Sequence, residues 1–420
     1  MNLDIFKDTK TKAVLVSVNE DMTEQESDSS LDELERLLET AGAEAIVRVI
    51  QNRTSPDKRT YVGSGKAKEI AEFIKSHEEE IGLVVFDNVL TPSQINNLEE
   101  ELDTRVIDRT MLILDIFALH ATTGEGKLQV EIACLRYTAP RLQGKGLQLS
   151  RLGGGIGTRG PGESKLESDR RHLKRRILAL SKELEDIDRI RAVKRSSREK
   201  SAVKSAAIIG YTNAGKSTLL NHLTDAGILA EDKLFATLDP TTRKLTLPSG
   251  NEILLTDTVG FIDRLPTHLI KAFKSTLDEL KYADMIICLT DASEQDSERI
   301  KKRAVTSKLI EELGAKDKPI INVYNKIDRV VDEEFIPKDA IPISSLDGTG
   351  VDKLLEKLDE VVANGKRVLK LFFSHSQQSK TSEVYRLARV IDTEYTDDGI
   401  IIIAECDTRA IGAFAEYTVK

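Results

Sequence analysis

The chain has 420 residues, a formal net charge of −9, 40% hydrophobic residues and 31% charged residues. No stretch approaches the ~20 apolar residues of a membrane helix, the N-terminus lacks the parts of a signal peptide, and Cys134, Cys288 and Cys406 lack metal-ligand spacing. We therefore expect a cytoplasmic monomer without a membrane span, a disulfide framework or a general affinity of its whole surface for nucleic acid.

Residues 1–155 are expected to form an N-terminal α/β domain. Predicted strands and helices alternate there, at 12–18, 30–43, 45–50, 64–76, 81–87 and 93–102. This alternation predicts a parallel sheet. Gly63-Ser64-Gly65-Lys66 resembles the end of a phosphate-binding loop. We reject that reading, because Thr60 stands where the first glycine is required and Ala67 offers no hydroxyl to a metal ion.

Residues 156–200 are expected to form a Gly/Arg loop followed by a basic helical arm. The surrounding segment 144–162 holds eight glycines and no acidic residue, so it cannot build a core. From Leu166 to Ile187 apolar residues recur at intervals of seven, which predicts a seam for a second helix in an antiparallel hairpin or for the first domain.

Charge in this part of the chain differs from that of the whole. Residues 170–200 include twelve basic and five acidic side chains. A plain linker and a solvated helix face are the alternatives, but we interpret loop and arm together as a surface for structured RNA, contacted through phosphate and shape. The candidate contacts are Arg151, Arg159, Arg170, Arg171, Arg175 and Arg176.

A GTPase domain is expected at 201–365. The apolar run 206–209 precedes a G-x-x-x-x-G-K-S sequence, and a helix-forming stretch follows it. Such a loop closes backbone N–H groups around a polyphosphate, with Lys216 reaching the β and γ phosphates and Ser217 ligating Mg²⁺. The loop residues are Gly210, Tyr211, Thr212, Asn213, Ala214, Gly215, Lys216 and Ser217.

Two further segments are predicted to sense the γ phosphate. Asp257, followed by Thr258, Val259 and Gly260, ends a predicted strand; its carboxylate would hold Mg²⁺ through water, and the Gly260 N–H would approach the phosphate. The candidate switch comprises Phe235, Ala236, Thr237, Leu238 and Asp239. Thr237 is our choice for the hydroxyl that meets Mg²⁺, with Thr241 and Thr242 as alternatives.

The base pocket is predicted from Asn325, Lys326, Ile327 and Asp328, which follow a buried strand. A carboxylate at Asp328 can accept hydrogen bonds from the N1–H and the exocyclic amine of guanine, whereas adenine presents an acceptor at N1. Backbone groups of Ser344, Ser345 and Leu346 would complete the pocket. The sequence thus predicts GTP and GDP as ligands.

The hydrolysis centre lacks a polar residue at one expected place. Phe261 stands where Ras-type GTPases carry the glutamine that positions water, so unaided hydrolysis is expected to be slow. Lys216, Thr237 and Gly260 are the predicted catalytic residues. Asn213 suggests activation by K⁺, against the alternative that it only stabilises its own loop.

Residues 366–420 are predicted to form a small α+β domain without a recognisable chemical motif. The predicted elements are 368–373, 382–390, 399–405 and 411–419.

The segment Leu152–Glu163, with Leu166-Glu167 and Asp169-Arg170-Arg171 after it, resembles the HflX family of translation GTPases. The resemblance continues through Val106–Thr110, 112–118 and the nucleotide motifs. It implies binding to the large ribosomal subunit and its ribosomal RNA, with GTP hydrolysis and splitting or recycling of stalled ribosomes. The alternatives are an ATP-dependent RNA-remodelling enzyme and a GTP-switched assembly factor of the large subunit.

Overall fold

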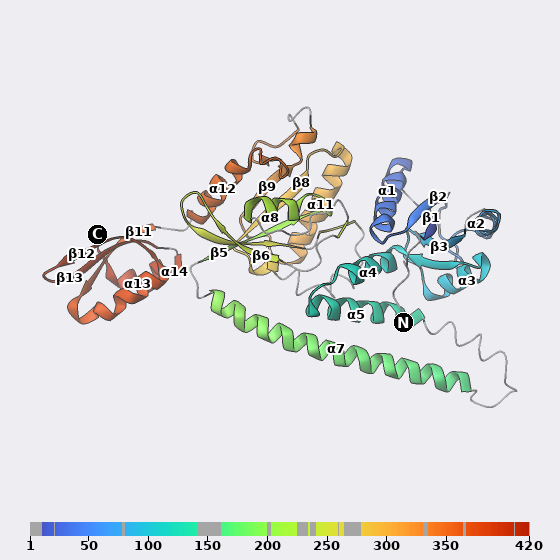
Figure 1. Cartoon of the computed structure of the whole chain (residues 1–420), viewed down its shortest axis with the longest axis horizontal. Coiled ribbons are helices and arrows are strands. Elements are labelled where there is room, and N and C mark those ends of the chain that lie inside the picture. The colour runs from blue at the N-terminus through green and yellow to red at the C-terminus, as the bar shows by residue number, and fades with distance from the viewer. Residues whose placement is uncertain are drawn as a thin grey trace. The chain divides into compact units, whose positions relative to one another are not determined.

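The structure is a computed structural model (Figure 1). It describes residues 11–20, 22–77, 80–141, 161–199, 203–224, 234–235, 241–258, 260–263, 279–330, 335–363, 367–406 and 408–419. These residues separate into two compact units, and the first contains the described residues up to Ile187 together with Leu234 and Phe235. No helix in the described ranges has the length and apolar character needed to cross a membrane.

The first unit is built on a four-stranded parallel sheet, as the alternation of elements predicts. The strand order is β2-β1-β3-β4, and three helices connect successive strands. The elements are β1 (Lys12–Asn19), α1 (Glu24–Thr40), β2 (Glu44–Asn52), α2 (Ser64–Ser76), β3 (Ile81–Phe86), α3 (Pro92–Leu102) and β4 (Arg105–Asp108). The inner strands β1 and β3 are almost wholly buried because helices cover both faces of the sheet.

Helix α1 begins six residues before the predicted start. Thr23 caps it: the Thr23 hydroxyl accepts from the Glu26 N–H, and the Glu26 carboxylate accepts from the Thr23 N–H at 2.8 Å. This capping box satisfies N–H groups at the helix start, so the acidic and serine-rich segment from Glu24 becomes helical although its apolar pattern begins only at Leu31.

Two helices that we did not predict follow β4, namely α4 (Arg109–His120) and α5 (Gly124–Thr138). Residues Leu112 to Phe117 of α4 are all buried, so the helix has no polar face and no amphipathic period to reveal it. Arg109, only 3% exposed, pairs with Asp87 at the end of β3 and with Glu33 of α1. This buried ion network joins α4 to the sheet.

Asp115 in α4 is a buried carboxylate, 3% exposed, without a hydrogen-bond partner among the described residues. Burial raises its pKa to about 7, although the charge of Arg105 acts in the opposite direction. An unfolded chain would ionise this group near pH 4, so the folded state loses stability as pH rises from about 4 to about 7.

We therefore expect Asp115→Asn to stabilise the protein. At about pH 8 the free energy of unfolding should rise by about 1–3 kcal/mol, and the gain should vanish below about pH 4, where both side chains are neutral. Denaturant unfolding of both proteins at several pH values measures this. A gain of the same size at every pH would show that the ionisation of Asp115 is not its cause.

The basic arm is one helix, α7 (Pro161–Glu199), and not a hairpin. Its predicted seam is correct: Leu173, Ile177, Leu180 and Leu184 are less exposed than their neighbours, and Leu180 is buried. Arg176 donates from Nε and Nη2 to Glu131 of α5, at 2.9 and 2.8 Å. The seam therefore packs within the first unit, the second of the two predicted arrangements.

The second unit contains a six-stranded sheet in the order β10-β9-β8-β5-β7-β6. All neighbours are parallel except β6 and β7, which form the predicted hairpin. The elements are β5 (Lys204–Gly210), α8 (Lys216–Thr224), β6 (Thr241–Thr246), β7 (Glu252–Asp257), β8 (Met285–Asp291), α11 (Asp296–Glu312), β9 (Ile320–Asn325), η2 (Ile327–Arg329), β10 (Ile341–Pro342) and α12 (Val351–Ala363). The predicted helix at 266–281 lies almost entirely outside the described residues.

One apolar core joins this sheet to its helices. Ile208, Leu219, Leu255, Ile287 and Leu354 are among its buried members. The predicted core thiol, Cys288, is buried in β8, and burial raises its pKa to about 11. A parallel sheet buried in this way places the carboxyl ends of β5, β7, β8 and β9 along one edge, where the nucleotide motifs follow.

The C-terminal residues form a second, antiparallel sheet in the order β12-β13-β11-β14 (Figure 1). It comprises β11 (Arg367–Ser374), η3 (His375–Lys380), α13 (Thr381–Leu387), β12 (Arg389–Thr396), β13 (Gly399–Cys406), α14 (Thr408–Ala413), η4 (Ala415–Tyr417) and β14 (Thr418–Val419). The α+β prediction is correct, but the predicted helix at 382–390 ends at Leu387, and most of 411–419 is helical.

Candidate functional site

The phosphate-binding loop connects β5 to α8, as predicted. Asn213 and Gly215 both adopt left-handed backbone conformations, with φ of 62° and 94°. A Cβ atom on Gly215 would lie 2.2 Å from Nδ2 of Asn325, so this position requires glycine for two reasons. The loop therefore closes tightly at the start of α8, where helix N–H groups favour negative charge.

Lys216 is buried at the first position of α8, and its Nζ donates to the carbonyl of Tyr211 at 2.9 Å. A Cβ on Gly260 would lie 2.9 Å from this Nζ, so a side chain there would press on the amine that phosphate must reach. Burial lowers the pKa of Lys216 to about 8; Asp257 raises it and Lys326 lowers it further. The ammonium thus lacks a full counter-charge until a phosphate arrives.

Nucleotide affinity should consequently depend on pH. Below about pH 8 Lys216 is protonated with or without nucleotide, so affinity should be constant; above it, binding must add a proton, and affinity should fall by up to about tenfold per pH unit. Titration calorimetry with GDP in buffers of different ionisation heats measures proton uptake. Zero uptake near pH 9 would contradict the lowered pKa.

Ser217 and Asp257 lie where Mg²⁺ ligands are expected. The Ser217 hydroxyl donates to Oδ2 of Asp257 at 2.7 Å, so α8 and the end of β7 bring two oxygen ligands together. In the described ranges no three His, Cys, Asp or Glu side chains form a metal cluster. Mg²⁺ in nucleotide sites takes few protein ligands and completes its octahedron with water and phosphate oxygens, so this oxygen pair fits it.

Phe261 is fixed against the phosphate-binding loop. Its carbonyl accepts from the Thr212 N–H at 2.7 Å, and its N–H donates to the Gly210 carbonyl at 3.2 Å. The side chain is 2% exposed. It therefore belongs to the core beneath the loop and cannot orient water in this conformation, as its apolar character predicts.

Asn325 links the loop to the predicted base pocket. Its Nδ2 donates to the Ala214 carbonyl at 2.8 Å, and its Oδ1 accepts from both the N–H and the hydroxyl of Ser345. Ser344 and Ser345 are buried, whereas the side chain of Leu346 is 75% exposed. Leu346 can thus take part only through its backbone, as we predicted.

Lys326 has an ion-pair partner that we did not predict. Its Nζ lies 2.7 Å from Oδ2 of Asp291, and its backbone is left-handed with φ of 66°. Asp291 ends β8, beside β9, so its place directly after a buried strand was the available signal. Ile327 donates to the Ile343 carbonyl, and Asp328 follows with its side chain 22% exposed.

Five of the predicted nucleotide contacts, listed here, lie outside the described residues: Ala236, Thr237, Leu238, Asp239 and Val259. Phe235 is described, and its ring packs edge-on against Phe117 of α4 with centroids 4.7 Å apart. The Leu234 N–H donates to the Thr40 hydroxyl at 3.3 Å. The start of the predicted switch therefore contacts the first unit, which the sequence did not indicate.

The two alternatives to Thr237 lie on a strand. Thr241 and Thr242 begin β6, and the Thr242 hydroxyl lies 2.9 Å from that of Thr256 on β7. Thr258 after β7 donates its hydroxyl to the Ile208 carbonyl and so fixes the segment beside the loop.

The predicted RNA contacts divide into three groups. Arg151 and Arg159 lie outside the described residues, whereas Arg170, Arg171 and Arg175 are exposed on α7. Arg176 is half-exposed and engaged with Glu131. It therefore has a structural contact in addition to any external one.

The chain matches three family models along most of its length. These are a GTP-binding GTPase N-terminal region (residues 28–118), a GTP-binding GTPase middle region (120–198) and a 50S ribosome-binding GTPase (205–326). GTPase HflX of Lacrimispora saccharolytica is 49% identical over 98% of this chain and 97% of its own length. The chain belongs to the HflX GTPase family. The resemblance inferred from the sequence is thereby confirmed, and the chain is a GTPase of the P-loop fold.

Other relatives agree with the HflX assignment. GTPase HflX of Escherichia coli K12 is 40% identical over 94% of this chain and 93% of its own length. A crystal structure of a GTP-binding protein from Sulfolobus solfataricus in complex with GDP is 27% identical, covers 85% of this chain and 99% of that chain, and has a TM-score of 0.46.

Proposed function

We propose that this chain binds the large ribosomal subunit and its ribosomal RNA, hydrolyses GTP there, and splits or recycles stalled ribosomes. The observation that carries the proposal is a complete phosphate-binding site whose water-positioning residue is replaced by a buried phenylalanine. Such a site binds GTP well and hydrolyses it slowly until another molecule completes it. The family matches support the ribosome as that molecule.

In the proposed reaction, water attacks the γ phosphate in line with the departing GDP. Lys216 would stabilise charge on the phosphate oxygens, and the Gly260 N–H would donate to the γ phosphate. Ser217, Thr237 and Asp257 would hold Mg²⁺, which when bound neutralises charge on the β and γ phosphates. Asn213, in its left-handed conformation, is our candidate K⁺ ligand.

The proposed K⁺ role has a direct test. Turnover should be faster in KCl than in NaCl of equal ionic strength, and Asn213→Ala should abolish the difference. Identical rates in both salts would remove K⁺ from the proposal.

The RNA-facing role of α7 rests on its charge. Arg170, Arg171 and Arg175 share one exposed helix, where guanidinium groups can contact phosphates without first breaking a buried ion pair. Nothing in the structure favours ATP chemistry at Gly63–Lys66, because Lys66 already pairs with Glu69 at 2.6 Å and Gly63 only begins α2.

Light scattering of intact ribosomes separates splitting from assembly. With GTP present, addition of the protein should lower the scattered intensity as subunits separate, and Lys216→Ala should not lower it. Binding to large subunits without any fall in scattering would favour the assembly factor instead.

A further inference from the structure

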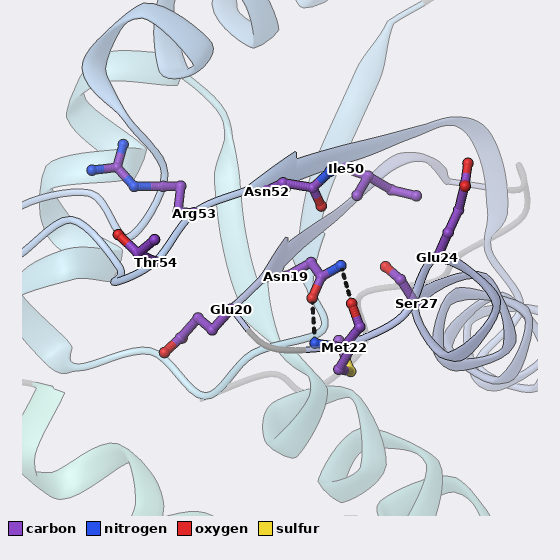
Figure 2. Close-up of a pocket in the computed structure, with 9 residues that line it drawn as sticks. All are labelled: Asn19, Glu20, Met22, Glu24, Ser27, Ile50, Asn52, Arg53 and Thr54. Carbon is purple, nitrogen blue, oxygen red and sulfur yellow. Dashed lines mark hydrogen bonds between the residues drawn. The ribbon is translucent and has the colours of Figure 1, made fainter.

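The first unit contains a hollow of about 650 Å³ at the carboxyl ends of β1 and β2 (Figure 2). Asn19 and Glu20 follow β1, residues 52–54 follow β2, and Glu24 and Ser27 lie in the first turns of α1. Ligands of open α/β sheets bind outside the carboxyl ends of parallel strands, and this volume lies within the range of small-molecule sites. The GTPase site does not use this region.

A buried hydroxyl at the hollow has no partner. Ser27 is 1% exposed, and its Oγ makes no hydrogen bond with any residue of the described chain. Figure 2 shows this hydroxyl directed from α1 into the hollow. A buried polar atom without a partner costs free energy, which a hydrogen bond from a ligand would recover.

Charges of both signs line the hollow on opposite sides. Figure 2 shows Arg53 on one side and Glu24 on the other, with Ile50 between them. Arg53 donates from Nε to the Ser55 carbonyl and makes no ion pair within the described ranges. The side chain of Ile50 is 37% exposed, so it offers an apolar surface between the two charges.

This charge pattern argues against a polyphosphate. The carboxylates of Glu20 and Glu24 outnumber the guanidinium of Arg53 and would repel a phosphate chain. The start of α1 offers no free anion site either, because its capping box occupies the N–H groups of Thr23 and Glu26. A simple cation fits poorly too, since Arg53 would repel it.

We propose that the hollow binds a small amphoteric molecule of the amino-acid class. Its carboxylate would pair with Arg53, its ammonium group with Glu24, and its apolar part would lie against Ile50, with Ser27 donating or accepting one hydrogen bond. This site is separate from the nucleotide site and extends beyond the proposed ribosomal function.

Titration calorimetry of the full-length protein with each standard amino acid tests the proposal. We expect at least one to bind with a Kd below about 10 mM. Analogues of that amino acid lacking only the carboxylate or only the amine should bind at least about tenfold more weakly. The proposal is wrong if no amino acid binds, or if the analogue lacking the amine binds as tightly as its parent.

Variants locate the binding. Arg53→Gln should weaken it at least about tenfold, whereas Arg59→Gln, an exposed arginine paired with Glu101, should not change it. Gly63→Ala is an independent test, because the new Cβ would lie 2.5 Å from Nη1 of Arg53 and displace the guanidinium without removing it. Equal affinity in all three variants would place the ligand elsewhere and overturn the assignment.

Ser27→Ala separates a ligand role from a structural one. It should weaken binding yet leave the melting temperature of the ligand-free protein unchanged or higher, because it removes a buried hydroxyl without a partner. A lower melting temperature together with unchanged affinity would show that the hydroxyl serves the fold alone.

Discussion

Asp328→Asn should shift base preference from guanine to xanthine. Asp328 follows β9, and its neighbours are held by the bonds of Asn325 to the phosphate loop and of Ile327 to the Ile343 carbonyl. An amide cannot accept both guanine protons, so GTP affinity should fall by about 100- to 1,000-fold, the loss of two hydrogen bonds to a charged acceptor. The same amide can donate to the C2 oxygen of xanthine, so XTP should bind better to the variant than GTP does.

Competition of GTP, XTP and ATP for a fluorescent nucleotide measures this preference. Asp339→Asn is a matched control, since Asp339 is exposed and outside the predicted base motif. Unchanged GTP selectivity in Asp328→Asn would show that the base lies elsewhere. The lysine of the same motif should then also be reconsidered, although its ion pair with Asp291 would remain a feature of the fold.

Reversing three charges on α7 should weaken ribosome binding steeply. Arg170, Arg171 and Arg175 are exposed, so their change to glutamate should leave the first unit folded while replacing three attractive phosphate contacts by repulsive ones. We expect affinity for large subunits to fall by at least about a hundredfold at low salt, and the salt dependence of binding to flatten by about three ions.

Arg176 is left unchanged in that variant because its pair with Glu131 belongs to the contact between α7 and α5. A triple change of Lys308, Lys338 and Lys353 to glutamate alters net charge equally on exposed positions of the GTPase fold. Sedimentation with purified large subunits compares the two variants. Equal loss in both would indicate a general charge effect, and full retention in the α7 variant would mean that the helix is structural only.

The nucleotide site could be predicted from sequence because each motif follows a buried strand of one parallel sheet. Carboxyl ends of such strands meet at one edge, so residues as distant as Gly215 and Asn325 had to come together once the strands were recognised. The close approach of Gly260 to Lys216 follows from the same geometry.

Features that depend on tertiary packing could not be predicted. Helix α4 is buried on all sides and therefore shows no helical period, and the contact of Phe235 with Phe117 joins residues more than a hundred positions apart. The hollow beside β1 and β2 has no motif, because its residues come from three separate elements. Asp291 was missed because a carboxylate after a strand has many possible partners, and only the fold selects Lys326.

The most direct measurement is the rate of GTP hydrolysis with and without purified large ribosomal subunits. Because Phe261 is buried and bonded to the phosphate loop, the isolated protein should turn over slowly, and saturating subunits should raise the rate by at least about tenfold. Small subunits at the same concentration serve as the control. An unchanged rate, with no co-sedimentation in either GTP or GDP, would contradict the account.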